Sequence, residues 1–148
     1  MTKVDFYILG AESSEQRQLF ACRLAEKAFK LGHSIYIHSE DQAQANALDQ
    51  LLWSWRNSSF VPHQLETKET DSNAQGLLNI GFNRGQGSST AVNGLLINLS
   101  PTVPEFFSRF ERVSEIVVQS ATVIESTRSN YRFYRDRGYP LENHDLRK

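Results

Sequence analysis

The first third of the chain alternates short apolar runs with stretches in which apolar residues recur every three or four positions. Short runs of this kind predict strands, and the recurring spacing predicts amphipathic helices. The predicted elements are strands at 4–9 and 34–38 and helices at 13–31 and 41–53. Ser13-Ser-Glu-Gln16 and Ser39-Glu-Asp-Gln42 have the form of capping boxes, which open helices. Strand, helix, strand and helix in this order predict an α/β domain that starts with parallel strands.

Each of these helices carries apolar residues along one side, so that side should pack on the sheet. The apolar positions of the first helix are Phe20, Leu24, Ala28 and Leu31, and those of the second are Leu48, Leu51 and Leu52.

The rest of the chain predicts four further strands, at 60–65, 76–82, 94–99 and 115–119. Pro62 restricts the first of them to a sheet edge or a strand end, because proline lacks the backbone donor. Pro104 opens a helix, and the last helix starts at about Thr122. The apolar side of the Pro104 helix carries Phe106, Phe107, Phe110 and Val113. With no repeat and no long linker, the chain fits one domain, 1–148.

The bulk numbers are those of an ordinary globular protein, with 39% hydrophobic and 22% charged residues. The net charge of −1 would not hold the whole protein on nucleic acid or on an anionic membrane. The single cysteine, Cys22, excludes an intrachain disulfide and a multi-cysteine zinc site. The start of the chain does not resemble a signal peptide, and no apolar run approaches the roughly 20 residues of a membrane span. We therefore expect a cytoplasmic protein that does not bind membranes.

The sequence offers little for catalysis. The first strand-to-helix turn has one glycine, Gly10, with neither a GxGxxG pattern nor a Walker lysine, so no nucleotide-binding loop is predicted. The four histidines show no metal-ligand spacing. His38, at the carboxyl end of a predicted strand, is the best catalytic candidate. We expect no catalytic site, no metal and no cofactor; the alternative is a nucleotide-handling enzyme that uses the cleft near Gly10 and His38.

The last predicted helix combines arginines with tyrosines. Arg128, Tyr131, Arg132 and Arg135 are three or four positions apart and share one face. Guanidinium groups pair with carboxylates while a ring covers apolar atoms, so this patch suits an acidic peptide with an apolar end. A phosphate backbone suits it almost as well, and a solvated basic helix end is the structural alternative.

A second group of large side chains surrounds the end of the 41–53 helix. Trp53, Trp55, Phe60 and Pro62 fall within ten positions, and the two tryptophans point in different directions on a helix. Clustered aromatic residues of this kind are typical of interface hot spots. The alternative is that one tryptophan caps the sheet and the other lies flat on the surface.

The chain resembles the chi subunit of bacterial DNA polymerase III holoenzyme nearly from end to end. The Leu-Trp block followed by Phe-Val-Pro-His is the specific part of the likeness. The resembling segments are Phe6-Tyr-Ile-Leu9, Glu40-Asp-Gln-Ala43, Leu48-Asp-Gln-Leu-Leu-Trp53, Ser59-Phe-Val-Pro-His63 and Tyr131-Arg-Phe-Tyr-Arg135 with Gly138.

The resemblance implies a Rossmann-like, three-layer α/β/α fold with a mostly parallel central sheet. It also implies a non-catalytic replisome adaptor that links the clamp loader, through the psi subunit, to the C-terminal tail of the single-stranded-DNA-binding protein. By matched position, the psi surface is Trp53, Phe60, Val61 and Pro62, and in some members a helicase competes for it. The tail site is Arg128, Tyr131, Arg132 and Arg135. Nucleic acid is then contacted only indirectly; direct single-strand binding is the alternative.

One position departs from the family pattern. Ile124 stands where a lysine, one helical turn before Arg128, is expected to pair with a carboxylate of the tail. The departure predicts weaker tail binding or a larger role for Arg132. The resemblance implies nothing for residues 66–87.

Overall fold

The computed structural model describes residues 2–54, 63–65, 78–82 and 94–147. The predicted interface residues Trp55, Phe60, Val61 and Pro62 lie outside these ranges. Trp53 is described only through its backbone, which belongs to a helix.

Seven strands form one sheet, in the order β3-β4-β2-β5-β6-β1-β7, and all six neighbouring pairs run parallel. Pairing sets Lys3 opposite Arg112 and Val4 opposite Leu141. The predicted parallel sheet is therefore confirmed, and β3 lies at its edge. The strands are β1 (Lys3–Ile8), β2 (Ile35–Ser39), β3 (His63–Leu65), β4 (Leu78–Phe82), β5 (Leu95–Asn98), β6 (Arg112–Val117) and β7 (Leu141–Asp145).

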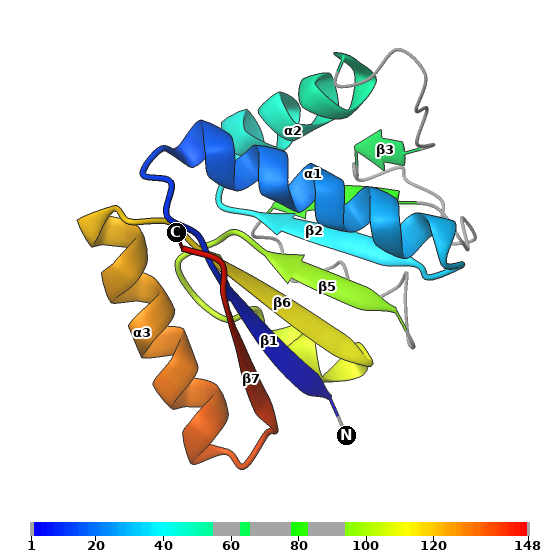
Figure 1. Ribbon diagram of the computed structural model, residues 1–148. Helices are drawn as coiled ribbons and strands as arrows, with labels where there is room; N and C mark the ends of the chain where they lie inside the picture. The colour runs from blue at the N-terminus through cyan, green and yellow to red at the C-terminus, as the bar shows by residue number, and fades with distance from the viewer. Residues whose placement is uncertain (1, 55–62, 66–77, 83–93, 148) are drawn as a thin grey trace.

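Helices cover both faces of this sheet. The helices are α1 (Ser14–Lys30), α2 (Gln42–Ser54) and α3 (Ala121–Asp136), with a short 3-10 helix, η2, at Glu105–Arg109. Figure 1 shows α1 and α2 together on one face and α3 on the other. Each face has its own apolar cluster, the first centred on Cys22, Ile37 and Ile97 and the second on Phe6, Phe107 and Tyr134. The expected three-layer α/β/α arrangement is confirmed.

Side chains cap the N-termini of the first two helices. The Ser13 hydroxyl accepts a hydrogen bond from the backbone of Gln16 at 3.1 Å, as the capping box predicts. At α2 the cap is Asp41, which accepts from the backbone of Gln44 at 2.8 Å. The box predicted to begin at Ser39 is wrong, because Ser39 ends β2 and is fully buried.

The buried face of α1 is rotated from the predicted one. Ala21, Cys22, Ala25 and Ala28 are buried, while Phe20 and Leu24 pack at the margin of the cluster. Leu31 is 68% exposed because α1 ends at Lys30 and the chain turns away at Gly32, where φ is +90°. Small side chains let α1 approach the sheet closely.

Two predictions in the second half of the chain need correction. The segment after Pro104 makes only the 3-10 turn η2, and Val113 belongs to β6, which starts at Arg112. The final strand, β7, is not predicted, since Leu141-Glu-Asn-His-Asp145 is polar and lies at the sheet edge. Among the described residues, every helix is too short or too polar to cross a membrane.

Candidate functional site

A cavity of about 250 Å³ lies beside α3, where this helix crosses the ends of β1, β6 and β7. Its apolar lining comes from four residues, Phe6, Ile8, Val117 and Ile124. Its polar lining comes from Gln119, Thr127, Arg128, Tyr131, Asn143 and Arg147. The cavity therefore has an apolar floor and a rim that carries two arginines.

Tyr131 and Thr127 fix the helix side of the cavity. The Tyr131 ring packs edge-on against Phe6 of β1, with 5.1 Å between ring centroids. The Thr127 hydroxyl, which is buried, donates to the carbonyl of Val123 at 2.7 Å. The Tyr131 ring is thus a half-buried wall of the site and holds α3 against the strand.

A buried polar network anchors the same helix to β6. Glu115 of β6 is fully buried and accepts hydrogen bonds from Asn130 (3.2 Å) and Tyr134 (2.8 Å) of α3 and from Asn98 (2.8 Å) of β5. Burial raises the pKa of Glu115, while the three donors and the nearby Arg17 oppose that rise. The two donors from α3 bind this helix to β6 at a buried carboxyl and so hold the helix side of the cavity in place.

Arginine supplies the charge at the rim. Arg128 on α3 is exposed, and Arg147, which follows β7, is an exposed residue that also lines the cavity. Two hydrogen bonds, of 2.9 and 2.7 Å, join the Arg147 guanidinium to the Asp145 carboxylate and lower the pKa of Asp145 to about 2. Among the described residues that line the cavity, none is acidic. Asp145 balances the charge of Arg147, so Arg128 gives the rim the positive charge that suits an anion.

The structure does not bring all four predicted tail residues together. Arg128 and Tyr131 line the cavity, whereas Arg132 and Arg135 are exposed on α3 and are not among its lining residues. Arg135 instead pairs with Asp136 at 3.1 Å. Ile124, where the resemblance predicts a lysine, is one of the apolar residues that line the cavity.

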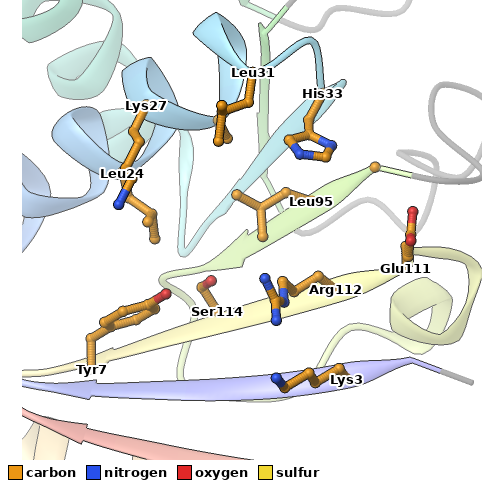
Figure 2. A pocket seen from close by; sticks show the side chains of 12 residues that line it. Lys3, Tyr7, Leu24, Lys27, Leu31, His33, Leu95, Glu111, Arg112 and Ser114 are labelled. Atoms are coloured by element: carbon orange, nitrogen blue, oxygen red, sulfur yellow. The ribbon is translucent and has the colours of Figure 1, made fainter.

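A larger cavity, of about 480 Å³, lies on the opposite face of the sheet (Figure 2). Leu24 and Leu31 of the α1 side face Lys3 and Arg112 on the strands. Both cations already have partners, since Lys3 is 3.4 Å from Glu142 and Arg112 is 3.1 Å from Asp5. The cavity is also lined by Lys27 and Glu111, so it is a groove of mixed apolar and charged character.

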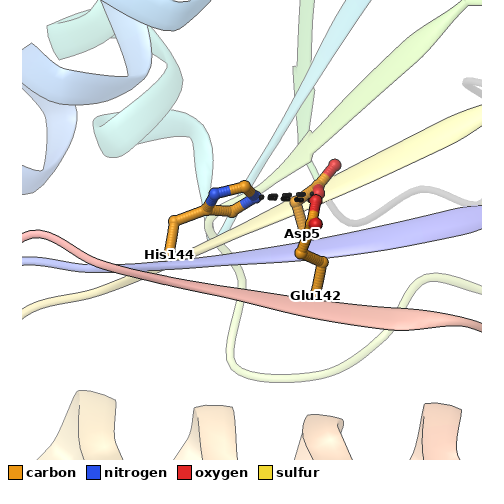
Figure 3. Close-up of side chains that lie close together, drawn as sticks. All are labelled: Asp5, Glu142 and His144. Carbon is orange, nitrogen blue, oxygen red and sulfur yellow. Dashed lines mark hydrogen bonds and ion pairs between the residues drawn. The ribbon is translucent and has the colours of Figure 1, made fainter.

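Asp5, Glu142 and His144 form the one metal-ligand-like group found among the described residues (Figure 3). Nε2 of His144 lies 3.0 Å from the Asp5 carboxylate and 3.4 Å from that of Glu142. Oxygen and imidazole ligands of this kind suit a divalent transition metal. However, the two carboxylates already pair with Arg112 and Lys3, so the group is accounted for as an ion network that joins β6, β1 and β7.

The groups of the enzyme alternative are poorly placed for catalysis. His38 is 4% exposed, its ring packs 5.5 Å from that of Phe106, and burial lowers its pKa to about 4. The backbone of Arg147 approaches Gly10, and a Cβ at Gly10 would lie 3.7 Å from the Arg147 Cα atom. His38 would have to leave the core before it could meet a substrate.

The sequence pattern singled out neither Asn143 nor Arg147. Both lie on or beside β7, the strand that periodicity missed, and Leu146 continues its pairing by donating to the Ile8 carbonyl at 2.8 Å. The available signal was weak, since Leu141 is the one apolar residue of β7.

Comparison with known proteins gives the family. A sequence model of the family described as "DNA polymerase III chi subunit, HolC" matches residues 1–142. The DNA polymerase III subunit chi of Pseudomonas aeruginosa is 42% identical over 146 residues, which cover 99% of this chain and 98% of that protein. The subunits chi of Escherichia coli and Haemophilus influenzae are 29% and 28% identical, each over 95% of this chain and 96% and 95% of their own lengths.

A solved structure supports the fold alone. The crystal structure of T4 UvsW superposes with a TM-score of 0.69 at 10% identity, over 99% of this chain and 42% of that one.

The family match and the relatives agree over nearly the whole length. The chain therefore belongs to the DNA polymerase III chi subunit family, the members of which are accessory subunits of DNA replication.

Proposed function

We propose that this protein is a non-catalytic cytoplasmic adaptor of the replisome, built as one chi-like domain over 1–148. It links the clamp loader, through the psi subunit, to the C-terminal tail of the single-stranded-DNA-binding protein. The observation that carries the proposal is the cavity beside α3, in which Arg128 and Tyr131 stand over an apolar floor. Membership of the chi family supports the same role.

The cavity has the chemistry that an acidic tail with an apolar end requires. Its volume of about 250 Å³ is below the range of drug-sized ligand pockets and suits a single side chain. Ile8, Val117 and Ile124 can bury an apolar terminal residue, and Arg128 can pair with a carboxylate through its planar fork. Arg132, exposed on α3, adds positive potential along the approach, and Arg135 adds less because it is paired with Asp136.

The psi surface is proposed at Trp53, Phe60, Val61 and Pro62, and a helicase is the second candidate partner for it. Support comes from α2, which leads into residues 55–62. Figure 1 shows α2 and α3 on opposite faces of the sheet. Two partners that dock on these helices can therefore be held at the same time.

Indirect contact with nucleic acid fits the site better than direct binding. Bases stack on exposed aromatic rings, but Tyr131 is half-buried against Phe6. Tyr134 is fully buried and bonded to Glu115. Of the two tyrosines on α3, only part of the Tyr131 ring is therefore open to a base, which is little for single-strand binding.

A peptide titration tests the tail site. A fluorescent Asp-Asp-Asp-Ile-Pro-Phe peptide is titrated into the wild type, Arg128→Ala and Arg137→Ala. Arg137 is the matched control, an exposed arginine at the end of α3 that stacks over Phe133 at 3.6 Å and does not line the cavity. We expect Arg128→Ala to bind about tenfold or more weakly, since a hydrogen bond to a charged group is lost.

The control should bind as tightly as the wild type. Equal binding by Arg128→Ala would remove the tail site from α3, and no binding by the wild type would refute the tail-binding role itself. For the psi surface, Trp53→Ala should lose psi in a pull-down and keep the peptide. Loss of psi and peptide together would indicate misfolding, which a thermal melt detects.

A further inference from the structure

We infer that the C-terminal strand forms the second wall of the tail site, and that Arg147 is a tail-binding residue that supplies a second cation beside Arg128. This inference rests on the proposed function and adds a specificity residue to it. The site then has two cationic sides from distant parts of the chain: Arg128 on α3 and Arg147 after β7. Ile124 belongs to the apolar floor of the cavity, where it can contact an apolar residue of the tail.

The pairing of β7 with β1 carries Arg147 into the cavity. Phe6 lies opposite Asn143 and Ile8 opposite Asp145 in the parallel register, and Phe6, Ile8 and Asn143 all line the cavity. Beyond the strand, the backbone of Leu146 donates to Ile8 at 2.8 Å, so the pairing continues up to the residue before Arg147. Strand geometry therefore fixes where the Arg147 side chain starts.

The opposite side of β7 is also held. Strand residues alternate between the two faces of a sheet, so His144 points away from the cavity that Asn143 lines. His144 binds the buried Asp5 carboxylate at 3.0 Å and stacks on Tyr7 with 4.7 Å between ring centroids. These contacts clamp the edge strand to β1 and preorganise the side of the site that carries Arg147.

Asp145 sets the direction of the guanidinium. It accepts from Nε and Nη2 of Arg147, at 2.9 and 2.7 Å. A guanidinium carries five donors, so the pair leaves others, among them those of Nη1, for a ligand carboxylate. The apolar end residue of a bound tail is expected to occupy the apolar floor of the cavity. The acidic residues of the tail are then expected to lie between Arg128 and Arg147.

The same peptide titration tests this inference with four further variants. Arg147→Ala and Arg147→Lys are compared with the Arg137→Ala control, and Ile124→Lys is made alone and in the Arg147→Ala background. We expect Arg147→Ala to bind about three- to tenfold more weakly, as expected for loss of a partly exposed charged contact. Arg147→Lys should be intermediate because a lysine keeps the charge and loses the fork. Ile124→Lys should restore much of the loss, since it returns a cation to the same cavity.

A second readout separates a direct contact from a structural effect. The aspartates of the peptide are replaced with asparagines, one at a time, so that each replacement removes one negative charge. A direct pair predicts that one replacement costs the wild type affinity and costs Arg147→Ala almost none. Wild-type affinity in Arg147→Ala, with binding lost in Arg128→Ala, would overturn this inference and leave the proposed function standing. Absence of binding by the wild type would overturn both. A changed melting temperature in Arg147→Ala without any peptide-charge coupling would also overturn it.

Discussion

The hydroxyl of Tyr134 donates a hydrogen bond to Oε2 of Glu115 across 2.8 Å and thereby ties α3 to the interior strand β6. Both side chains are fully buried. Asn98 donates to the same oxygen at 2.8 Å, so the carboxyl is satisfied only while helix and sheet keep their relative positions. The buried carboxyl therefore fixes the helix that carries Arg128 and Tyr131.

We expect Tyr134→Phe to lower the free energy of unfolding by about 1–3 kcal/mol, because Glu115 loses a donor while it stays buried. Urea denaturation of the two proteins measures the difference. Tyr139→Phe is the matched control, since Tyr139 packs on the same Phe107 ring, at 5.1 Å, but is only partly buried. Equal losses in the two variants would mean that the bond to Glu115 contributes nothing specific.

Burial of His38 predicts a pH dependence of stability. Its pKa is about 4 in the folded protein against the ordinary 6.5, so the unfolded chain binds more protons between these values. Stability is fully present above pH 6.5 and falls as the pH drops toward 4. The expected loss from this residue is about 2 kcal/mol between pH 7 and pH 5.

His38→Gln should flatten that slope, whereas His33→Gln, at an exposed position, should keep it. The measured quantity is the difference in unfolding free energy between the two pH values, so a change in overall stability does not enter. The raised pKa of Glu115 acts in the opposite direction, since stability then falls as the pH rises. That contribution is common to the wild type and both variants and cancels in the comparison. An unchanged slope in His38→Gln would contradict the buried, neutral imidazole.

Periodicity predicts most elements that bury apolar side chains, although it extends η2 into a longer helix, and it misses the polar strand β7. The apolar run of Leu95, Leu96 and Ile97 predicts strand β5, and these residues are buried at the centre of the sheet. Strand β7 lies at the edge, so its polar residues can face solvent and leave no apolar run. Small residues also mislead a prediction based on large apolar side chains. Helix α1 lies close to the sheet and buries Ala21 and Ala25, whereas the larger Leu31 is exposed.

The residues of the candidate site also differ in how far the sequence predicts them. Arg128 and Tyr131 could be predicted because helical spacing alone puts them on one face. Arg147 could not, since its place opposite Arg128 depends on the pairing of β7 with β1, which no local pattern encodes. Pairing between distant strands is set by tertiary packing.

Salt should weaken tail binding without abolishing it. The two arginines lie at an exposed rim, where ionic interactions are screened within about 8 Å at physiological salt and about 3 Å at 1 M. In the proposed complex, an apolar terminal residue of the tail contacts Val117 and Ile124, and salt does not screen such a contact. We expect the peptide affinity to fall steeply up to about 0.5 M salt and then to level off, with a shallower fall in Arg128→Ala. A salt-independent affinity would remove the ion pairs from the binding model.

Gly94 marks a place where the sheet has no room for a side chain. A Cβ atom there would overlap the carbonyl oxygen of Ser34 and lie 3.0 Å from its carbonyl carbon. That oxygen accepts a hydrogen bond from the backbone of Leu95 at 2.8 Å, so it cannot move without weakening the start of β5. We expect Gly94→Ala to destabilise the protein by about 1–3 kcal/mol in urea denaturation.

Gly10→Ala is the matched control, because the nearest atom to a Cβ there is the Arg147 Cα at 3.7 Å, an ordinary contact. It should change the free energy of unfolding by no more than about 0.5 kcal/mol. Similar denaturation midpoints for the two variants would show that the backbone of Ser34 yields easily. In that case the close approach of Gly94 to the turn before β2 would not constrain the register of β5 against β2.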